Sequence, residues 1–356
     1  MCSSSKWLEI TFWVEFIGFF LSVSSHFILI YLILEKPKAT FGNYKYLMIS
    51  FSASGIFYSC LNFWCKPNIH LSETSFAIFT ILKTSGVSQP IGVVLITLYC
   101  SSYAMMLSLL SVQFFYRYTS VISPLNSTRF SRKTAPFYII YVISFFNIWA
   151  LLTYFINGPS NMKNQEFIPA FQIEYCLGPT DFSYIGAKYY YFENEIRRYH
   201  WPSFICIFTM SSLMCSTFSG LSYFGTCTFK TLKKVGLTSY GSKELQNQLF
   251  RTLVVQTIIP TIFMYFPVSC MFLFPMIGLQ IEQVAIFIPI TVSIYPCLEP
   301  MVAMYCIKDF RHRIQGSSLM FRVLITLLLN IPVSDILTCS TVTRIQVSST
   351  QRDSFF

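Results

Sequence analysis

Charged side chains are scarce in this sequence of 356 residues, because Asp, Glu, Lys and Arg together make up only 11% of it. An ordinary soluble domain has about 25% of such residues, so this chain has too few charges to cover a surface that faces water. Hydrophobic residues make up 54% of the chain and aromatic residues 18%. The composition excludes a typical soluble domain and indicates a protein embedded in lipid.

Catalytic signatures are also missing from the sequence. The four histidines (His26, His70, His200 and His312) are scattered along the chain. There is no H-E-x-x-H motif, no Walker loop and no G-x-S-x-G motif. We therefore predict that the protein is not an enzyme and that it has no cofactor and no metal site.

Long runs without Asp, Glu, Lys or Arg define the fold. A helix needs about 20 apolar residues to cross the hydrocarbon core, and seven runs are long enough, the last broken only by Glu299. Backbone groups in lipid must be paired within the segment, and no alternating strand pattern is present, so the runs are helices. We predict an all-α membrane protein, a seven-transmembrane helix bundle. Its helices are expected at approximately 11–34, 44–65, 89–116, 135–157, 202–229, 250–276 and 283–307.

Basic residues are distributed unequally between the two sets of loops. The loops after helices 1, 3 and 5, with the segment after helix 7, hold 16 Lys and Arg against three acids, whereas the other side holds seven against nine. Cytoplasmic loops are the ones enriched in Lys and Arg, so we predict the N-terminus outside and the C-terminus inside. The net charge of +10 is therefore a topology signal and gives no argument for nucleic acid.

The chain divides into two parts at about residue 313. Residues 1–313 are predicted to form the seven-helix domain, and residues 314–356 a cytoplasmic tail that is largely disordered. The tail contains the apolar run SLMFRVLITLLLNIPV, which is short for an eighth span. Two interpretations stay open for this run: an interfacial helix at 318–331, or a sequence artefact such as retained non-coding sequence.

The third apolar run stops at Tyr116-Arg117-Tyr118, which the predicted topology places at the cytoplasmic end of helix 3. Arg117 has two interpretations. It is either an interfacial anchor whose charge reaches the headgroups, or a planar fork of donors that faces a cytoplasmic cavity and binds a partner's carbonyl groups. Its position alone does not separate them.

Four blocks of sequence carry a resemblance to a known family. They are TFGNYKYLMISFSASGIFYS (40–59), FFYRY (114–118), ELQNQLFRTLVVQTIIPTIFMYFPV (244–268) and YPCLEPMVAMYCIKDFR (295–311). In this order they resemble the Str group of nematode seven-helix chemoreceptors, distant relatives of rhodopsin-like G-protein-coupled receptors. Together they span roughly residues 20 to 312.

The resemblance implies a G-protein-coupled chemosensory receptor of the odorant type. A small environmental molecule is expected among the outer halves of helices 3, 5, 6 and 7, and a heterotrimeric G protein at the inner ends. The residues implied in coupling and activation are Tyr116, Arg117, Tyr118, Glu299 and Pro300. Tyr116 stands where the wider class has an acid, and Glu299-Pro300 where this group usually has Asp-Pro.

The implied partners are a small neutral odorant, a heterotrimeric G protein and the lipid bilayer, with no nucleic acid. The implied location is the plasma membrane, as a multi-pass protein of a sensory-neuron cilium. The alternative is a seven-span channel or carrier for a small molecule. Against it, the halves show no internal repeat and the helices no charged pathway beyond Glu299.

Prolines and one acid stand out inside the apolar runs. Pro260 and Pro267 in helix 6 and Pro296 in helix 7 each remove a backbone hydrogen bond, so we predict hinges there, with a static kink as the other interpretation. Glu299 is the one acid deep in a predicted span. A carboxyl in that position is costly unless it is protonated or paired, which favours a function over packing.

Aromatic and sulfur-containing side chains supply the candidate ligand pocket. The candidates, each of which could equally be packing between helices, are Tyr99, Tyr103, Phe204, Phe208, Met264, Phe266 and Phe287. They carry no charge, which favours a small neutral ligand. Only Cys2, Cys65 and Cys176 fall at or beyond the predicted outer face, where oxidation can occur. A Cys65–Cys176 disulfide is the bridge that we consider.

Overall fold

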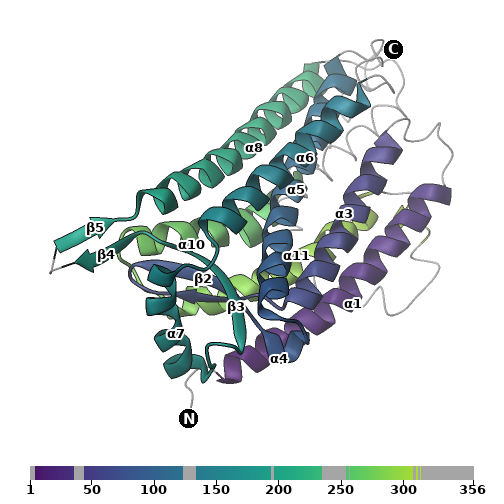
Figure 1. The fold of residues 1–356 in the computed structure, drawn as a ribbon. Helices are drawn as coiled ribbons and strands as arrows, with labels where there is room; N and C mark the ends of the chain where they lie inside the picture. The colour runs from purple at the N-terminus through teal and green to yellow at the C-terminus, as the bar shows by residue number, and fades with distance from the viewer. Residues whose placement is uncertain are drawn as a thin grey trace, which may run out of the picture. The chain divides into compact units, whose positions relative to one another are not determined.

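The computed structural model describes residues 5–35, 44–122, 134–193, 196–234, 254–255, 257–307, 310–311 and 313. The chain divides into two compact units, Met1–Cys306 and Ile307–Phe356. All the helices and strands labelled in Figure 1 belong to the first unit. The predicted tail at 314–356, with its apolar run at 318–331, lies outside the described residues.

Seven of the described helices are long and apolar enough to cross a membrane, which confirms the predicted seven-helix architecture. In chain order they are α1 (Ser5–Glu35), α3 (Tyr44–Cys65), α5 (Gln89–Ile122), α6 (Ala135–Leu151) continued by the π-helix η2 (Leu152–Ile156), α8 (Trp201–Lys234), the π-helix η3 (Thr261–Tyr265) continued by α10 (Phe266–Met276), and α11 (Glu282–Cys306). Such helices pair all their backbone groups internally, as lipid requires.

Helix α5 forms the centre of the bundle. It packs against α3, α6 and α8, while α1 packs against α3 and α11. In the most apolar window of α5, 78% of residues are buried, against 17% for the span that contains α6. Ser101, Ser102 and Ala104 are buried along α5, and small residues of this kind let neighbouring helices approach closely.

A three-stranded antiparallel sheet covers one end of the bundle, which we call the sheet end. Its strands are β1 (Asn68–Leu71), β2 (Ser75–Ile81) and β3 (Phe182–Lys188), in the order β1-β2-β3. The register pairs Ile78 with Ile185. We refer to these three strands as the roof sheet. The apolar runs of the sequence did not predict this sheet.

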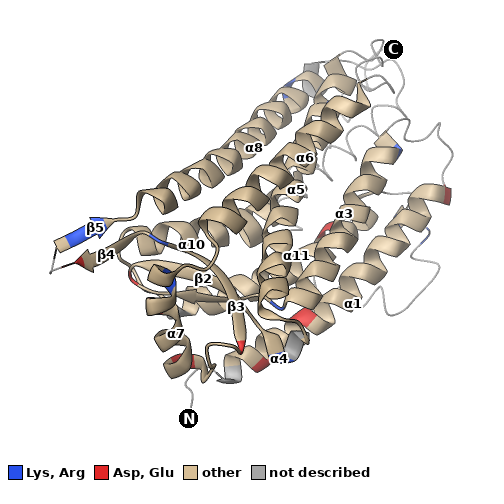
Figure 2. Ribbon diagram, viewed as in Figure 1, with Lys and Arg blue, Asp and Glu red and all other residues tan. Residues whose placement is uncertain are grey.

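The roof sheet is itself covered by the helix α7 (Asn161–Tyr175). Phe167 and Phe171 of α7 pack with Phe79 of β2 and Phe182 of β3 in a separate apolar cluster. The short helix α4 (Leu82–Ser85) follows β2, and a second hairpin, β4 (Tyr190–Glu193) with β5 (Ile196–Tyr199), precedes α8. Figure 2 shows charged residues on this hairpin and near α7, whereas the middle turns of α6 and α8 carry none.

The predicted Cys65–Cys176 disulfide is wrong. Cys176 is disulfide-bonded, but Cys65 is a free thiol with no exposed surface. The reason is local, because Cys65 ends α3 beneath the roof sheet, where Thr80 donates a hydrogen bond to its backbone carbonyl. The remaining described cysteines are also free.

Candidate functional site

An apolar cavity lies under the roof sheet, with about 630 Å³ of empty space. The cavity is lined by Tyr58, Pro67, Ile69, Phe76, Ile78, Tyr99, Cys100, Tyr103, Trp149, Thr153, Asn157, Ile185, Met210, Val268, Met271, Phe272, Ile288, Pro289 and Val292. No charged side chain is present among these described lining residues.

Four aromatic side chains make up one wall of the cavity. The rings of Tyr58 in α3 and Tyr99 in α5 stack with centroids 5.3 Å apart, and the Tyr58 hydroxyl donates to that of Tyr99 over 3.2 Å. Tyr103 lies one turn further along α5, with its ring 5.6 Å from that of Trp149 in α6. Because the two tyrosine hydroxyls bond each other, this wall presents mainly carbon to a ligand.

The structure brings only part of the predicted pocket to this cavity. Tyr99 and Tyr103 line it. Phe204 packs against Tyr189 with ring centroids 5.3 Å apart, and Met264 is fully buried, but neither side chain is in the lining. Three further side chains lie on exposed outer faces of the helices instead: Phe208, Phe266 and Phe287.

Sequence reasoning missed the lining residues that come from the roof sheet and from the end of α6. The roof sheet contributes Phe76 and Ile78 from β2 and Ile185 from β3. The sequence did contain one signal, since the run SFAIFTI in the loop after α3 is more apolar than a loop exposed to water. No such signal marked Thr153 and Asn157.

Thr153 and Asn157 form the polar corner of the cavity. Thr153 is 1% exposed and Asn157 is 3% exposed. Lys163 of α7 lies behind this corner, and its Nζ donates to the carbonyl groups of Ile156 (2.7 Å) and Gly158 (2.9 Å). Burial lowers the pKa of the Lys163 ammonium to about 8, since desolvation disfavours the charged form.

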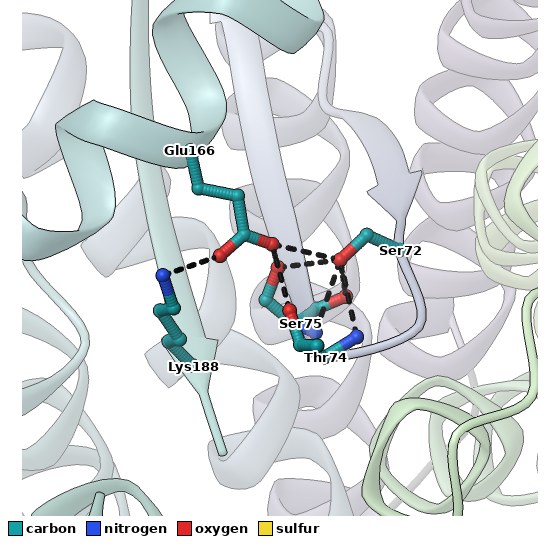
Figure 3. Close-up of polar contacts among 5 residues, drawn as sticks. All are labelled: Ser72, Thr74, Ser75, Glu166 and Lys188. Atoms are coloured by element: carbon teal, nitrogen blue, oxygen red, sulfur yellow. Dashed lines mark hydrogen bonds and ion pairs between the residues drawn. The ribbon is translucent and has the colours of Figure 1, made fainter. Parts of the chain in front are cut away.

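An ion pair attaches α7 to the roof sheet (Figure 3). Glu166 Oε2 lies 2.8 Å from Lys188 Nζ at the end of β3, while Oε1 accepts hydrogen bonds from the hydroxyl groups of Ser72, Thr74 and Ser75. Burial alone would raise the pKa of Glu166, but these bonds and the Lys188 charge hold that pKa below its ordinary value. The carboxylate therefore joins the β1–β2 turn, β3 and α7.

A second, more polar cavity lies beside the first at the sheet end. It has about 900 Å³ of empty space, and its lining includes Thr11 and Asn68 as well as His70 and Glu174. His70 Nδ1 lies 3.2 Å from Glu174 Oε2. Ile69 and Pro289 line both cavities, so the two cavities share a wall.

The predicted coupling motif lies at the opposite end of the bundle, where α3 begins and α5 nears its end. Arg117 is 4% exposed, and its Cζ lies 3.5 Å from the centroid of the Tyr44 ring. Tyr116 also stacks on Tyr44, with centroids 5.4 Å apart. Tyr118 packs against Phe224 of α8. Among the described residues, Nε and Nη2 of Arg117 have no hydrogen-bond partner.

Glu299 and the predicted hinges lie in the last two membrane-spanning segments. Glu299 is buried in α11, which contains both Pro296 and Pro300. Pro260 directly precedes η3, and Pro267 lies in the first turn of α10. A π-helix therefore fills the interval between the two prolines, and local changes of helix type of this kind are common at functional sites.

Comparison with known proteins gives a consistent result. The family described as "Serpentine type 7TM GPCR chemoreceptor Str" matches residues 11–315. The protein "Serpentine receptor class r-10" of Caenorhabditis elegans is 29% identical over 313 residues, which cover 88% of this chain and 92% of that protein. Its namesake in Caenorhabditis briggsae is 28% identical over 313 residues, covering 86% and 90%. "G-protein coupled receptor str-33" of Caenorhabditis elegans is 26% identical over 288 residues, covering 80% and 84%.

Proposed function

Because the chain belongs to the Str family of serpentine seven-transmembrane chemoreceptors, we propose that it is a G-protein-coupled chemosensory receptor of the odorant type. In this proposal the cavity under the roof sheet binds a small environmental molecule. The opposite end of the bundle, around Arg117, activates a heterotrimeric G protein.

One observation carries the proposal: the cavity and the arginine lie on the same central helix. Tyr99 and Tyr103 of α5 line the cavity, and Arg117 follows on the same unbroken helix. Fourteen residues separate Tyr103 from Arg117, which corresponds to about 21 Å along an α-helix. The two sites are thus too far apart to share a ligand, but a rigid element connects them.

The proposed signal passes through the helices that contain prolines. The cavity is bounded by Val268 and Met271 of α10 and by Ile288 and Val292 of α11. A ligand changes the balance between two arrangements only if it binds one of them better. In this proposal α10 and α11 pivot about η3 and Pro296, and the ligand fits the cavity best after this movement. The same movement separates the ends of the two helices that lie away from the roof sheet.

The described lining contains no charged side chain, which supports a neutral ligand. A charged ligand would lose its hydration without gaining a counter-ion. The proposal includes the orientation predicted from the basic loops, with the sheet end outside the cell and the Arg117 end inside. It also includes the plasma membrane of a sensory-neuron cilium as the location.

The test is a response to odorants that depends on both the cavity and a G protein. The receptor is expressed in cultured cells with a G protein, and odorants are screened by calcium imaging. Val268→Phe adds a ring to the cavity and should weaken the response to an active odorant by roughly tenfold or more. Val94→Phe is the matched control, because Val94 is 43% exposed on α5.

A second measurement separates a receptor from a channel. Purified receptor and G protein in lipid vesicles should exchange nucleotide faster when the active odorant is added. An odorant-evoked current in cells whose G proteins are blocked, without any nucleotide exchange, would contradict the proposal.

A further inference from the structure

Two residues in the lining of the apolar cavity each carry a buried polar atom without a hydrogen-bond partner among the described residues. They are Oγ1 of Thr153 and Oδ1 of Asn157. Both residues line the cavity and both are buried. A buried acceptor or hydroxyl group without a hydrogen bond is destabilising. A ligand that forms hydrogen bonds with both groups would remove this cost.

Thr153 lies in the π-helix η2 at the end of α6, and Asn157 directly follows that helix. The backbone N–H of Asn157 donates to the carbonyl of Leu152 over 3.2 Å, which is the i→i+5 bond of a π-helix. Residues four apart lie close to the same face of a helix. Thr153 and Asn157 have this spacing.

The backbone around the corner is fixed by neighbouring groups. Lys163 Nζ bonds the carbonyls of Ile156 and Gly158, and the N–H of Gly186 in β3 donates to the carbonyl of Asn157 over 2.7 Å. A Cβ atom on Gly158 would lie 2.4 Å from the carbonyl oxygen of Tyr154. The corner is therefore held in place before any ligand arrives, which reduces the entropic cost of binding.

We propose that this corner is a subsite for the hydroxyl group of a small alcohol. The ligand hydroxyl donates to Asn157 Oδ1 and accepts a hydrogen bond from the hydroxyl of Thr153, while the carbon skeleton packs on the rings of Tyr103 and Trp149. One group that both donates and accepts satisfies both atoms. This inference rests on the proposed function and narrows its ligand to one chemical class.

The surroundings of the corner disfavour charged alternatives. The Lys163 ammonium donates to the two carbonyls that flank Asn157 and is not part of the cavity lining. An amine that carries a positive charge would be repelled by it. A carboxylate would be buried without reaching it, and an unpaired buried charge is costly.

The experiment uses three probes with the same number of non-hydrogen atoms. The probe n-pentanol donates and accepts, n-butyl methyl ether only accepts, and n-hexane does neither. Each is titrated into the full-length receptor in lipid nanodiscs, and binding is measured by the shift in thermal unfolding. We expect n-pentanol to bind about tenfold more tightly than the ether, and the ether more tightly than n-hexane.

Two substitutions separate the two contacts. Asn157→Leu should remove the preference for the alcohol over the ether, and Thr153→Val, which nearly keeps the shape, should remove the preference for the ether over the hydrocarbon. The matched controls are Asn147→Leu on α6 and Thr226→Val on α8, both at exposed positions. These controls should keep the ranking of the wild type. Should Asn157→Leu fail to fold, Thr153→Val still tests the corner.

Two results would overturn the inference. The first is that the wild type binds all three probes equally well or binds none of them. The second is that Asn157→Leu and Thr153→Val both keep the wild-type order of the three probe affinities. Failure of the proposed function is separate, because nucleotide exchange driven by any odorant, of whatever class, establishes the receptor. A receptor that responds only to compounds without a hydroxyl would keep the function and refute the subsite.

Discussion

The guanidinium of Arg117 lies on the ring of Tyr44, with Cζ 3.5 Å from the ring centroid. Tyr116 stacks on the same ring, that of Tyr44, and the resemblance implies that Tyr116 occupies the position where the wider class has an acid before the arginine. A buried cation–π contact of this kind is worth about 2 kcal/mol. We propose that this aromatic stack restrains the arginine in the resting state.

Replacing Tyr44 should release this restraint. Tyr44→Leu removes the ring, and a loss of about 2 kcal/mol corresponds to an equilibrium shift of about 30-fold, so basal nucleotide exchange should rise. Tyr44→Phe keeps a ring and should leave basal exchange close to wild type. Equal basal activity in wild type and Tyr44→Leu would show that the stack does not hold the resting state.

Arg117→Lys separates the two interpretations of the arginine. A lysine reaches headgroups as well as an arginine does, so an anchor would tolerate the change. If the unpartnered donors of Arg117 bind a G protein in a planar arrangement, Arg117→Lys should reach the surface and bind ligand, yet signal roughly tenfold more weakly. Potency and maximum equal to wild type would favour the anchor.

Glu299 is expected to act through its carboxyl group. It is buried in α11 between two prolines, and a carboxyl at membrane depth needs a polar partner or a proton. Glu299→Gln keeps the hydrogen-bonding shape, so surface expression should persist while odorant potency changes by roughly tenfold. Glu299→Leu should impair expression, response or both. Dose-response curves like wild type from both variants would assign Glu299 to packing.

The sequence predicted the seven helices because each is a long run of apolar residues, a local property. It could not predict the roof sheet, since β2 and β3 are more than 100 residues apart and their register depends on the folded bundle. This is why Phe76 and Ile185 were missing from the predicted pocket. The same limit explains the wrong disulfide, because whether Cys65 points inward depends on the roof sheet above it.

The polar corner escaped prediction for a different reason. A π-helix differs from an α-helix by one residue per turn, and no composition marks it. Conversely, Phe208, Phe266 and Phe287 looked like pocket residues because they are aromatic and near the predicted outer end. Charge-free helices carry apolar residues on every face, so the sequence does not show which face points to lipid.

Orientation is testable at one sequon. Asn126-Ser127-Thr128 is the only N-x-[ST] site in the chain; it lies outside the described residues, in a loop predicted to be cytoplasmic. We expect no glycan at Asn126, and we expect a tag inserted at residue 3 to be labelled on intact cells. The measurement is a glycosidase mobility shift with surface labelling. A glycan at Asn126 would reverse the orientation and contradict the receptor proposal.

The roof attachment should depend on pH through Glu166. Burial raises the pKa of this carboxyl group, but Lys188 and the hydroxyl groups of Ser75 and Ser72 outweigh burial and hold the pKa in the folded protein below its ordinary value. A carboxyl with a lowered pKa contributes stability above the unfolded pKa, about 4.5, and loses it as the pH falls through the folded value. The contribution of Glu166 to the thermal stability of the purified receptor should therefore be constant near neutral pH and be lost below about pH 4.5.

Variants of Glu166 and Lys188 show how much of the stability that is lost in acid comes from this ion pair. Glu166→Gln should destabilise the receptor by about 1–3 kcal/mol near neutral pH and reduce the acid-dependent loss, because the glutamine does not titrate. Lys188→Met removes the other charge, and the double variant should cost less than the sum of the single changes, since the two side chains act on each other. Additive effects, or an acid transition in Glu166→Gln as large as in wild type, would show that α7 is held on the roof sheet by its phenylalanine cluster and not by Glu166.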